Sequence, residues 1–177
     1  ENMVSYVTGL KIKKLAARLD SFVEGRTLDD NATIMVEYDG GAKGLYWVSQ
    51  IAVGYDNGLR IRVFGTKGGL EFFQEDPNHL VVTPLGGPTK KLSRGRDAMS
   101  DRATELSRVP AGHPEGYFEA FANIYTTFAK AVAKKKAGKS VDESKEDYPT
   151  IDEGIQGVRF IHRCVESSKK DAAWVDF

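Results

Sequence analysis

Along the first half of the chain, hydrophobic and polar residues alternate with a period of two, which is the pattern of β-strands. The alternation is cleanest in residues 32–38, whose apolar side chains share one face: Ala32, Ile34, Val36 and Tyr38. We predict a strand there with that face buried. Further β-rich runs predict strands at residues 11–23, 44–54, 59–64, 70–73 and 79–83. Lysines in residues 11–23 favour an edge strand, and a short helix is the competing interpretation there.

Residues 44–73 are predicted to form an antiparallel meander. Asn57 and Gly58 tolerate the positive φ angles of a tight hairpin turn, and a second Gly-rich turn at residues 65–69 leads into the next strand. The strand at residues 44–54 carries no charge on either face, so we expect both faces to be covered. One face is predicted to pack on helices of the same domain, and the other on a surface outside this chain.

The second half of the chain changes to helical periodicity, in which apolar residues recur every three or four positions. A first helix is predicted to begin near Pro114 and to end in a lysine run before Gly138. Its apolar stripe consists of Phe118, Phe121, Tyr125, Phe128 and Val132. A second helix is predicted from residue 149 to residue 168, and a final strand at residues 172–177. Between the two patterns, the Gly- and Pro-rich residues 84–114 predict a long surface connection.

Strands followed by two long helices indicate an α+β fold, with an open, mainly antiparallel β-sheet and helices packed on one face. The length of 177 residues fits one domain, residues 1–177. Residues 1–8 have the pattern of a helix end closed by Gly9. Because the chain opens in phase with a helix and without Met, we expect it to be a piece of a longer protein.

The composition argues against several classes of partner. Lys plus Arg and Asp plus Glu number 25 each, so a formal net charge of zero argues against nucleic acid and anionic membranes as partners. No apolar run has the length of a membrane span. The single cysteine, Cys164, excludes an internal disulfide and a multi-thiolate metal site, and it favours a cytoplasmic location.

Motifs for phosphate, dinucleotide and metal binding do not fit. Residues 65–69 resemble part of a phosphate-binding loop, but they open a strand instead of a helix, so we predict a hairpin. No Gly-x-Gly-x-x-Gly follows a strand, and the three histidines lack metal-ligand spacing, so no metal site is predicted.

Two places carry polar groups suited to recognition. His113 lies in a stiff Pro- and Gly-rich loop before the first helix, and a stiff loop holds donors and acceptors at fixed points. The alternative is structural, with His113 capping the helix and Glu115 complementing its N-terminus. Gln50 lies mid-strand on a face predicted to be covered, where a buried amide either bonds a neighbouring loop or faces a ligand.

Five segments taken in order resemble the C-terminal domain of the Gfo/Idh/MocA oxidoreductases: residues 30–41, 47–57, 61–72, 112–123 and 149–154. The resemblance covers nearly the whole chain. It implies the glyceraldehyde-3-phosphate-dehydrogenase-like C-terminal fold, whose sheet lines a substrate pocket and forms the oligomer interface. It also implies a parent enzyme in which a Rossmann domain binds NAD or NADP and hydride passes to or from a sugar, inositol or related polyol.

The resemblance also implies what this chain lacks. The family's nucleotide fingerprint, its Glu-Lys-Pro segment with the catalytic lysine and its Asp-x-Gly-x-x-x-His-like segment do not occur here. We therefore expect no catalytic residue and no cofactor on this chain, and no turnover by it alone. The residues carried over as substrate-binding are Gln50, Asn57, His113 and Tyr117. The competing hypothesis is a non-catalytic assembly domain whose sheet face pairs subunits in a homo-oligomer.

Overall fold

The computed structural model describes residues 1–96, 99–143 and 146–177. They form two compact units, which are described one at a time. Unit 1 combines the two ends of the sequence, Glu1–Tyr55 and Pro149–Phe177, and unit 2 is the intervening segment Asp56–Tyr148. The α+β class and the antiparallel strand pairing are confirmed, with the strands divided between two four-stranded sheets.

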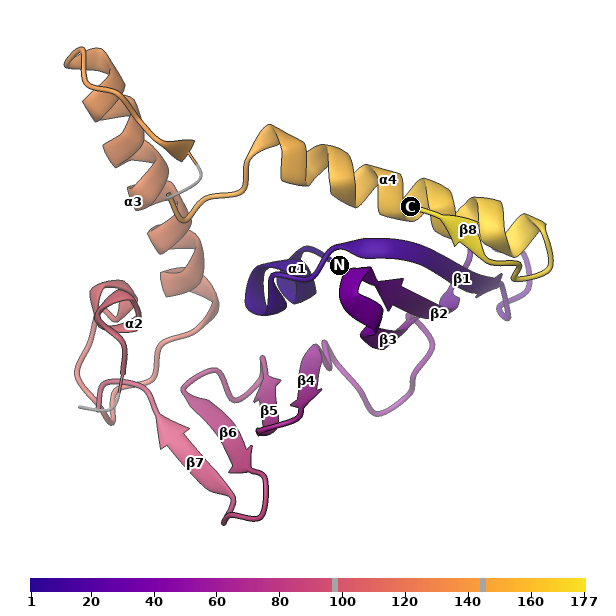
Figure 1. Ribbon diagram of the computed structural model, residues 1–177, viewed down its shortest axis with the longest axis horizontal. Helices are drawn as coiled ribbons and strands as arrows, with labels where there is room; N and C mark the ends of the chain where they lie inside the picture. Colours follow the sequence, from indigo (N-terminus) through magenta and orange to yellow (C-terminus); the bar gives the residue numbers. More distant parts are fainter. Residues whose placement is uncertain (97–98, 144–145) are drawn as a thin grey trace. The chain divides into compact units, whose positions relative to one another are not determined.

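Unit 1 is a sheet covered by one long helix (Figure 1). Its strands pair antiparallel in the order β3-β2-β1-β8. The elements are α1 (Asn2–Thr8), β1 (Ile12–Asp20), β2 (Asn31–Tyr38), a 3-10 turn η1 (Asp39–Gly41), β3 (Lys43–Ser49), α4 (Ile151–Lys169) and β8 (Val175–Asp176). As predicted, α1 ends at Gly9, which adopts the left-handed conformation with φ of 68°.

The core of unit 1 follows from the alternation in β2. The four predicted inward residues of that strand are all buried, and they share a cluster with Leu15 of β1 and Cys164 of α4. Tyr46 of β3 packs on Phe160 of α4, with ring centroids 5.5 Å apart. The predicted strand at residues 32–38 and its buried face are therefore confirmed.

The prediction that β1 lies at an edge is wrong. It pairs with β2 on one side and with the short β8 on the other, through Lys14 and Leu15. Beyond β8, hydroxyl groups from α4 continue the pairing, because Ser167 Oγ accepts from the N–H of Ala17 and Ser168 Oγ from that of Leu19. The strand is thus bonded along both sides although β8 is short.

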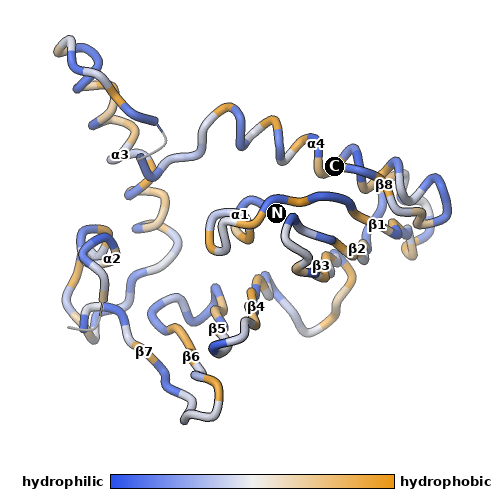
Figure 2. The backbone as a smooth tube through the Cα atoms, viewed as in Figure 1, coloured by the Kyte–Doolittle hydropathy of each residue, from blue (hydrophilic) through white to orange (hydrophobic). Residues whose placement is uncertain are grey.

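Apolar residues that recur at helical spacing along α4 are exposed. Ile151, Ile155, Val158 and Ile161 are each more than half exposed. The side of α4 that packs on the sheet instead carries Phe160, Cys164 and Ser167. Figure 2 shows hydrophobic positions recurring along α4 between hydrophilic ones. The helix itself is confirmed, and small residues allow it to approach β1 closely.

Unit 2 contains a second antiparallel sheet, in the order β4-β5-β6-β7, followed by two helices. The elements are β4 (Arg60–Gly65), β5 (Gly68–Phe73), β6 (His79–Pro84), β7 (Lys90–Ser93), α2 (Asp101–Leu106) and α3 (Tyr117–Lys136). The predicted hairpin at residues 65–69 is confirmed, because Gly65 pairs with Gly68 across the β4–β5 turn. The lysine run closes α3 as expected.

The predicted hairpin at Asn57 and Gly58 is wrong. β3 pairs with β2, and β4 pairs with β5, so the strands before and after this turn belong to different sheets. The backbone N–H groups of Asn57 and Gly58 donate to Glu75 Oε1, at 3.2 and 2.7 Å. A side chain thus satisfies the donors of this turn in place of a strand partner.

The segment at residues 84–114 contains more regular structure than predicted. β7 adds to the sheet by pairing with β6. Ser100 begins α2 as its N-cap, and its hydroxyl accepts from the N–H of Ala103 at 3.2 Å. Among the described residues, no helix combines the length and apolarity that crossing a membrane requires.

Candidate functional site

The four residues predicted to bind substrate are divided between the units. Gln50 belongs to unit 1, whereas Asn57, His113 and Tyr117 belong to unit 2. Within unit 2, His113 and Tyr117 lie together at the start of α3, and Asn57 is bound to Glu75 after β5. The structure therefore brings two of the four residues into one local arrangement, which is the His113 loop (residues 108–116) and the first turn of α3.

The prediction that Gln50 lies mid-strand on a covered face is wrong. β3 ends at Ser49, and Gln50 is an exposed residue in the bend that follows. The ladder ends there because Ser49 pairs with Asn31, the first residue of β2. The backbone N–H of Gln50 donates to the carbonyl of Asp30 at 2.8 Å, which leaves its side-chain amide exposed on the surface of unit 1.

Asp30 fixes this corner of unit 1. Its carboxylate is buried and accepts hydrogen bonds from the backbone N–H groups of Phe22 and Val23, both at 3.0 Å. The N–H of Phe22, then that of Val23 and the nearby Arg26 guanidinium lower the pKa of Asp30 against the opposing effect of burial. The charged carboxylate therefore holds the turn beside Gln50.

His113 and Tyr117 are both exposed at the start of α3. The His113 N–H donates to the carbonyl of Pro110 at 3.2 Å, which makes a tight turn, and the imidazole is open to solvent. The Tyr117 side chain is 65% exposed, and its ring packs on Phe121 with centroids 4.9 Å apart. Imidazole nitrogens and a phenol hydroxyl are donors and acceptors that match the hydroxyl groups of a polyol.

Glu115 closes the His113 loop from within. Its side chain is 7% exposed, and Oε1 accepts from the backbone N–H groups of Arg108 and Val109 at the start of the loop. The same oxygen lies 3.2 Å from a guanidinium nitrogen of Arg94, whose side chain is 15% exposed. One carboxylate thus joins both ends of the loop to the residue after β7.

Arg94 and Asn78 complete the support. Arg94 donates to the carbonyl oxygens of Val109, at 2.7 Å, and of His113, and its Nε donates to Asn78 Oδ1 at 3.0 Å. The Asn78 amide pairs with the backbone of Glu115 in both directions, each bond 3.0 Å long. Side chains from the turn before β6 and the residue after β7 therefore hold the loop on the sheet.

The structural alternative for this loop was wrong in its details. The N-cap of α3 is Gly116, and Glu119 supplies the capping carboxylate, because its Oε2 accepts from the Gly116 N–H at 2.9 Å. That hydrogen bond is the main cause that lowers the pKa of Glu119. Glu115 instead points into the loop, and the His113 side chain is not a cap.

Sequence reasoning missed Arg94 and Asn78. Both lie next to short strands, in stretches that the sequence pattern marks only as turns or connections. The available signal for Arg94 was opposite charge: an arginine follows a strand, and a glutamate lies in the later Pro- and Gly-rich loop. Hydrophobic periodicity reports only on neighbouring residues, so it does not reveal a long-range contact of this kind. Glu115 was singled out, but for a different role.

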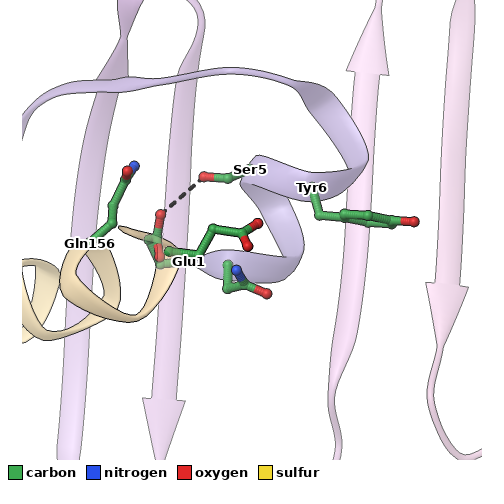
Figure 3. A pocket seen from close by; sticks show the side chains of 6 residues that line it. Glu1, Ser5, Tyr6 and Gln156 are labelled. Carbon is green, nitrogen blue, oxygen red and sulfur yellow. Dashed lines mark hydrogen bonds between the residues drawn. The ribbon is translucent and has the colours of Figure 1, made fainter. Parts of the chain in front are cut away.

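A separate small pocket lies in unit 1, with a volume of about 120 Å³. It is lined by Glu1, Asn2, Ser5, Tyr6, Glu153 and Gln156. Figure 3 shows the hydroxyl of Ser5 bonded to the Glu1 carboxylate and the Tyr6 ring directed away from both. None of the four predicted residues lines it, and ligand pockets are usually about 300 Å³ or more, so it does not define the site.

The described residues do not fit a dinucleotide or a metal ion. The Gly-rich turn at residues 65–69 joins two strands, and a Cβ on Gly68 would lie 2.4 Å from the Thr83 carbonyl oxygen, so the space beside it is already filled. The turn opens no helix whose N-terminus would receive a pyrophosphate. Within residues 1–96, 99–143 and 146–177, no group of three or more His, Cys, Asp or Glu side chains is placed to hold a metal.

Comparison with known proteins gives a match over almost the whole chain. Residues 2–177 match the model of the oxidoreductase family's C-terminal alpha/beta domain, of the Gfo/Idh/MocA type. The uncharacterized oxidoreductase YfiI of Bacillus subtilis (strain 168) is 39% identical over 169 residues, which are 95% of this chain and 43% of that protein.

Solved structures agree with this match. An oxidoreductase from Sinorhizobium meliloti is 49% identical, with a TM-score of 0.91 over 98% of this chain and 49% of its own. An inositol dehydrogenase homolog from Azotobacter vinelandii, complexed with NADH and myo-inositol, is 39% identical, with a TM-score of 0.94 over 99% of this chain and 47% of its own. The chain thus spans about half the length of the relatives it matches.

Proposed function

Because the chain belongs to the Gfo/Idh/MocA oxidoreductase family, whose C-terminal α/β domain it forms, we propose that it is the substrate-binding part of an NAD(P)-dependent oxidoreductase. The substrate class is a sugar, inositol or related polyol, and the reaction is hydride transfer. The observation that carries this proposal is the 39% identity to the Azotobacter vinelandii protein complexed with NADH and myo-inositol. The proposal retains the cytoplasmic location predicted from the single cysteine.

The exposed polar groups of the site support this substrate class. A polyol presents several hydroxyl groups, each of which both donates and accepts hydrogen bonds. His113 and Tyr117 offer such groups from a loop that is fixed by hydrogen bonds, so little ordering entropy is lost when a ligand binds. We propose that these two residues of unit 2 contact substrate hydroxyls. That Asn57 and, on unit 1, Gln50 bind substrate stays a prediction for each residue by itself.

NAD or NADP would be bound by another part of the parent enzyme. We propose that the described residues of this chain bind and orient the polyol. We propose that this chain alone catalyses no hydride transfer. The test is absorbance of the reduced nicotinamide when the chain is mixed with myo-inositol and NAD or NADP, and turnover above the protein-free rate would contradict it.

Binding is tested separately from turnover. We expect myo-inositol, titrated into the isotope-labelled chain, to shift backbone and ring resonances of His113 and Tyr117 by NMR. Cyclohexanol is the matched control ligand, because it has the same ring size and a single hydroxyl group. Shifts of equal size with both ligands, or none at these residues with myo-inositol, would overturn the proposed site.

The sheet face of unit 1 favours the second role, subunit assembly. Met35 pairs with Leu45, and the neighbouring Trp47 lies on the same face. These side chains are 48%, 70% and 60% exposed, which is high for large apolar residues on one surface. We propose that this face forms the contact of a homo-oligomer, as a self-complementary surface.

Sedimentation velocity tests the assembly role. We expect the chain to form a concentration-dependent dimer and the double substitution Leu45→Ser with Trp47→Ser to shift it toward monomer. Leu28→Ser is the control, because Leu28 is 76% exposed but lies in a turn outside the sheet. A chain that stays monomeric at every concentration would contradict assembly through this face without affecting the polyol proposal.

A further inference from the structure

Arg94 is the residue on which the hydrogen bonds of the His113 loop converge. Its guanidinium reaches Asn78 Oδ1, Glu115 Oε1 and the carbonyl oxygens of Val109 and His113. Its backbone N–H also donates to the carbonyl of Asn78 at 2.8 Å. Only the planar fork of an arginine supplies several donors at such fixed angles, so a lysine would not replace it.

The next residue brings the loop into backbone contact. Gly95 has φ of +76°, and a Cβ there would lie 2.8 Å from the backbone nitrogen of Ala111. The tip of the loop therefore packs directly on the turn after β7. The other end is bound to α3, because Arg108 Nε donates to Asn123 Oδ1 at 2.8 Å. The whole loop is fixed on both sides, while the His113 imidazole is left exposed.

We propose that Arg94 is a positioning residue of the polyol site, acting through the His113 carbonyl and the Glu115 carboxylate to set where the His113 imidazole stands. The inference rests on the proposed function, because the role of the fixed loop would be to hold His113 for polyol binding. Arg94 itself is 15% exposed, and its donors are directed at protein acceptors, so its contribution to binding is indirect. A misplacement of about 1 Å in a binding group costs up to about 100-fold in rate or affinity.

The principal test compares Arg94→Lys with Arg62→Lys in the 177-residue chain. Arg62→Lys is the matched control, because it makes the same chemical change at an exposed position of β4. Without ligand, we expect Arg94→Lys to shift or broaden the His113 imidazole resonances, with the sheet resonances of β4–β7 unchanged. With myo-inositol, we expect its dissociation constant to rise on the order of tenfold. Arg62→Lys should change neither.

The outcomes separate the two proposals. An unchanged His113 ring spectrum in Arg94→Lys would overturn the positioning role, whether or not the chain binds myo-inositol. A ring spectrum that changes in a chain that does not bind myo-inositol would overturn the proposed function and leave the loop geometry standing. If Arg94→Lys unfolds unit 2, Glu115→Gln replaces it, because that change keeps the side-chain volume and removes the charge that Arg94 contacts. The same two readouts then apply.

Discussion

The backbone N–H of Ala17 donates a hydrogen bond to the hydroxyl of Ser167, 2.8 Å away and 150 residues later in the sequence. The same hydroxyl donates to the carbonyl of Ala173 at 2.6 Å. Ser167 and Ala17 are both buried, so the Ala17 N–H has no access to water at this point. One serine therefore joins β1, α4 and the segment that leads to β8.

Replacing this hydroxyl should weaken unit 1. In Ser167→Ala, the buried Ala17 N–H loses its hydrogen-bond partner, which costs about 1–3 kcal/mol in the free energy of unfolding. Urea denaturation followed by tryptophan fluorescence measures it, since both tryptophans lie in unit 1. Ser21→Ala, at an exposed turn, is the control and should change stability by less than about 0.5 kcal/mol. Equal effects would contradict the role of Ser167.

The stability of unit 1 should also fall in acid because of Asp30. The N–H of Phe22 is the main cause that lowers the pKa of Asp30 in the folded chain. A carboxylate whose pKa is lowered on folding stabilises the fold at pH values above its unfolded pKa, which is about 3.9 for Asp. This stabilisation is lost as the pH falls through the pKa of the folded chain. We therefore expect Asp30→Asn to lower stability near neutral pH and to flatten its decrease below about pH 4.

The matched control for this change is the exposed neighbour Asp29. Asp29→Asn should leave the pH dependence of the urea midpoint close to that of the unchanged chain. If both substitutions give the same slope between about pH 4 and about pH 2, Asp30 is not the group whose titration destabilises unit 1.

The β4–β5 hairpin offers a paired test of backbone packing. A Cβ at Gly68, which has φ of +153°, would lie 2.4 Å from the Thr83 carbonyl oxygen, whereas one at Gly65 would meet only Gly68 O at 3.8 Å. Gly68→Ala should therefore destabilise unit 2 by about 1–3 kcal/mol, and Gly65→Ala by less than about 1 kcal/mol. Thermal unfolding followed by circular dichroism compares the two, and similar losses would contradict the close approach of β5 to β6.

The only cysteine should be unreactive in the folded chain. Cys164 is 4% exposed, and burial raises the pKa of its thiol to about 11. Near pH 8 we expect a disulfide reagent to label it at least about 100-fold more slowly in the native chain than in urea. Ser21→Cys provides an exposed thiol in the same molecule, so labelling should show one fast and one slow phase. Two fast phases would contradict the burial of Cys164.

The parts of the fold that sequence patterns predicted are those set by neighbouring residues. The buried face of β2 follows from strict alternation, and the hairpin at residues 65–69 follows from its glycines. The start of α4 follows from Thr150, whose hydroxyl and the Glu153 carboxylate form a capping box. Each of these signals lies within a few residues of the structure that it specifies.

The parts that were mispredicted depend on which segments pair. Asn57 and Gly58 have the composition of a hairpin turn, but β3 finds its partner in β2, and Glu75 satisfies the turn. Gln50 lies one residue beyond the end of the β2–β3 ladder, which no local pattern marks. At the candidate site, the stiff loop with His113 could be predicted, but Arg94 could not, because each of its side-chain partners lies 15 or more residues away in the sequence.

The discontinuous make-up of unit 1 fixes an order of events during translation. The strands β1, β2 and β3 are synthesised before unit 2, whereas α4 and β8 belong to Pro149–Phe177 and are synthesised after it. Unit 2 is continuous, so all of Asp56–Tyr148 has been made while the N–H groups of Ala17 and Leu19 still await Ser167 and Ser168. The nascent chain must therefore carry the uncovered core face of β1 and β2 until α4 has been synthesised, and this interval is when chaperones would be needed most.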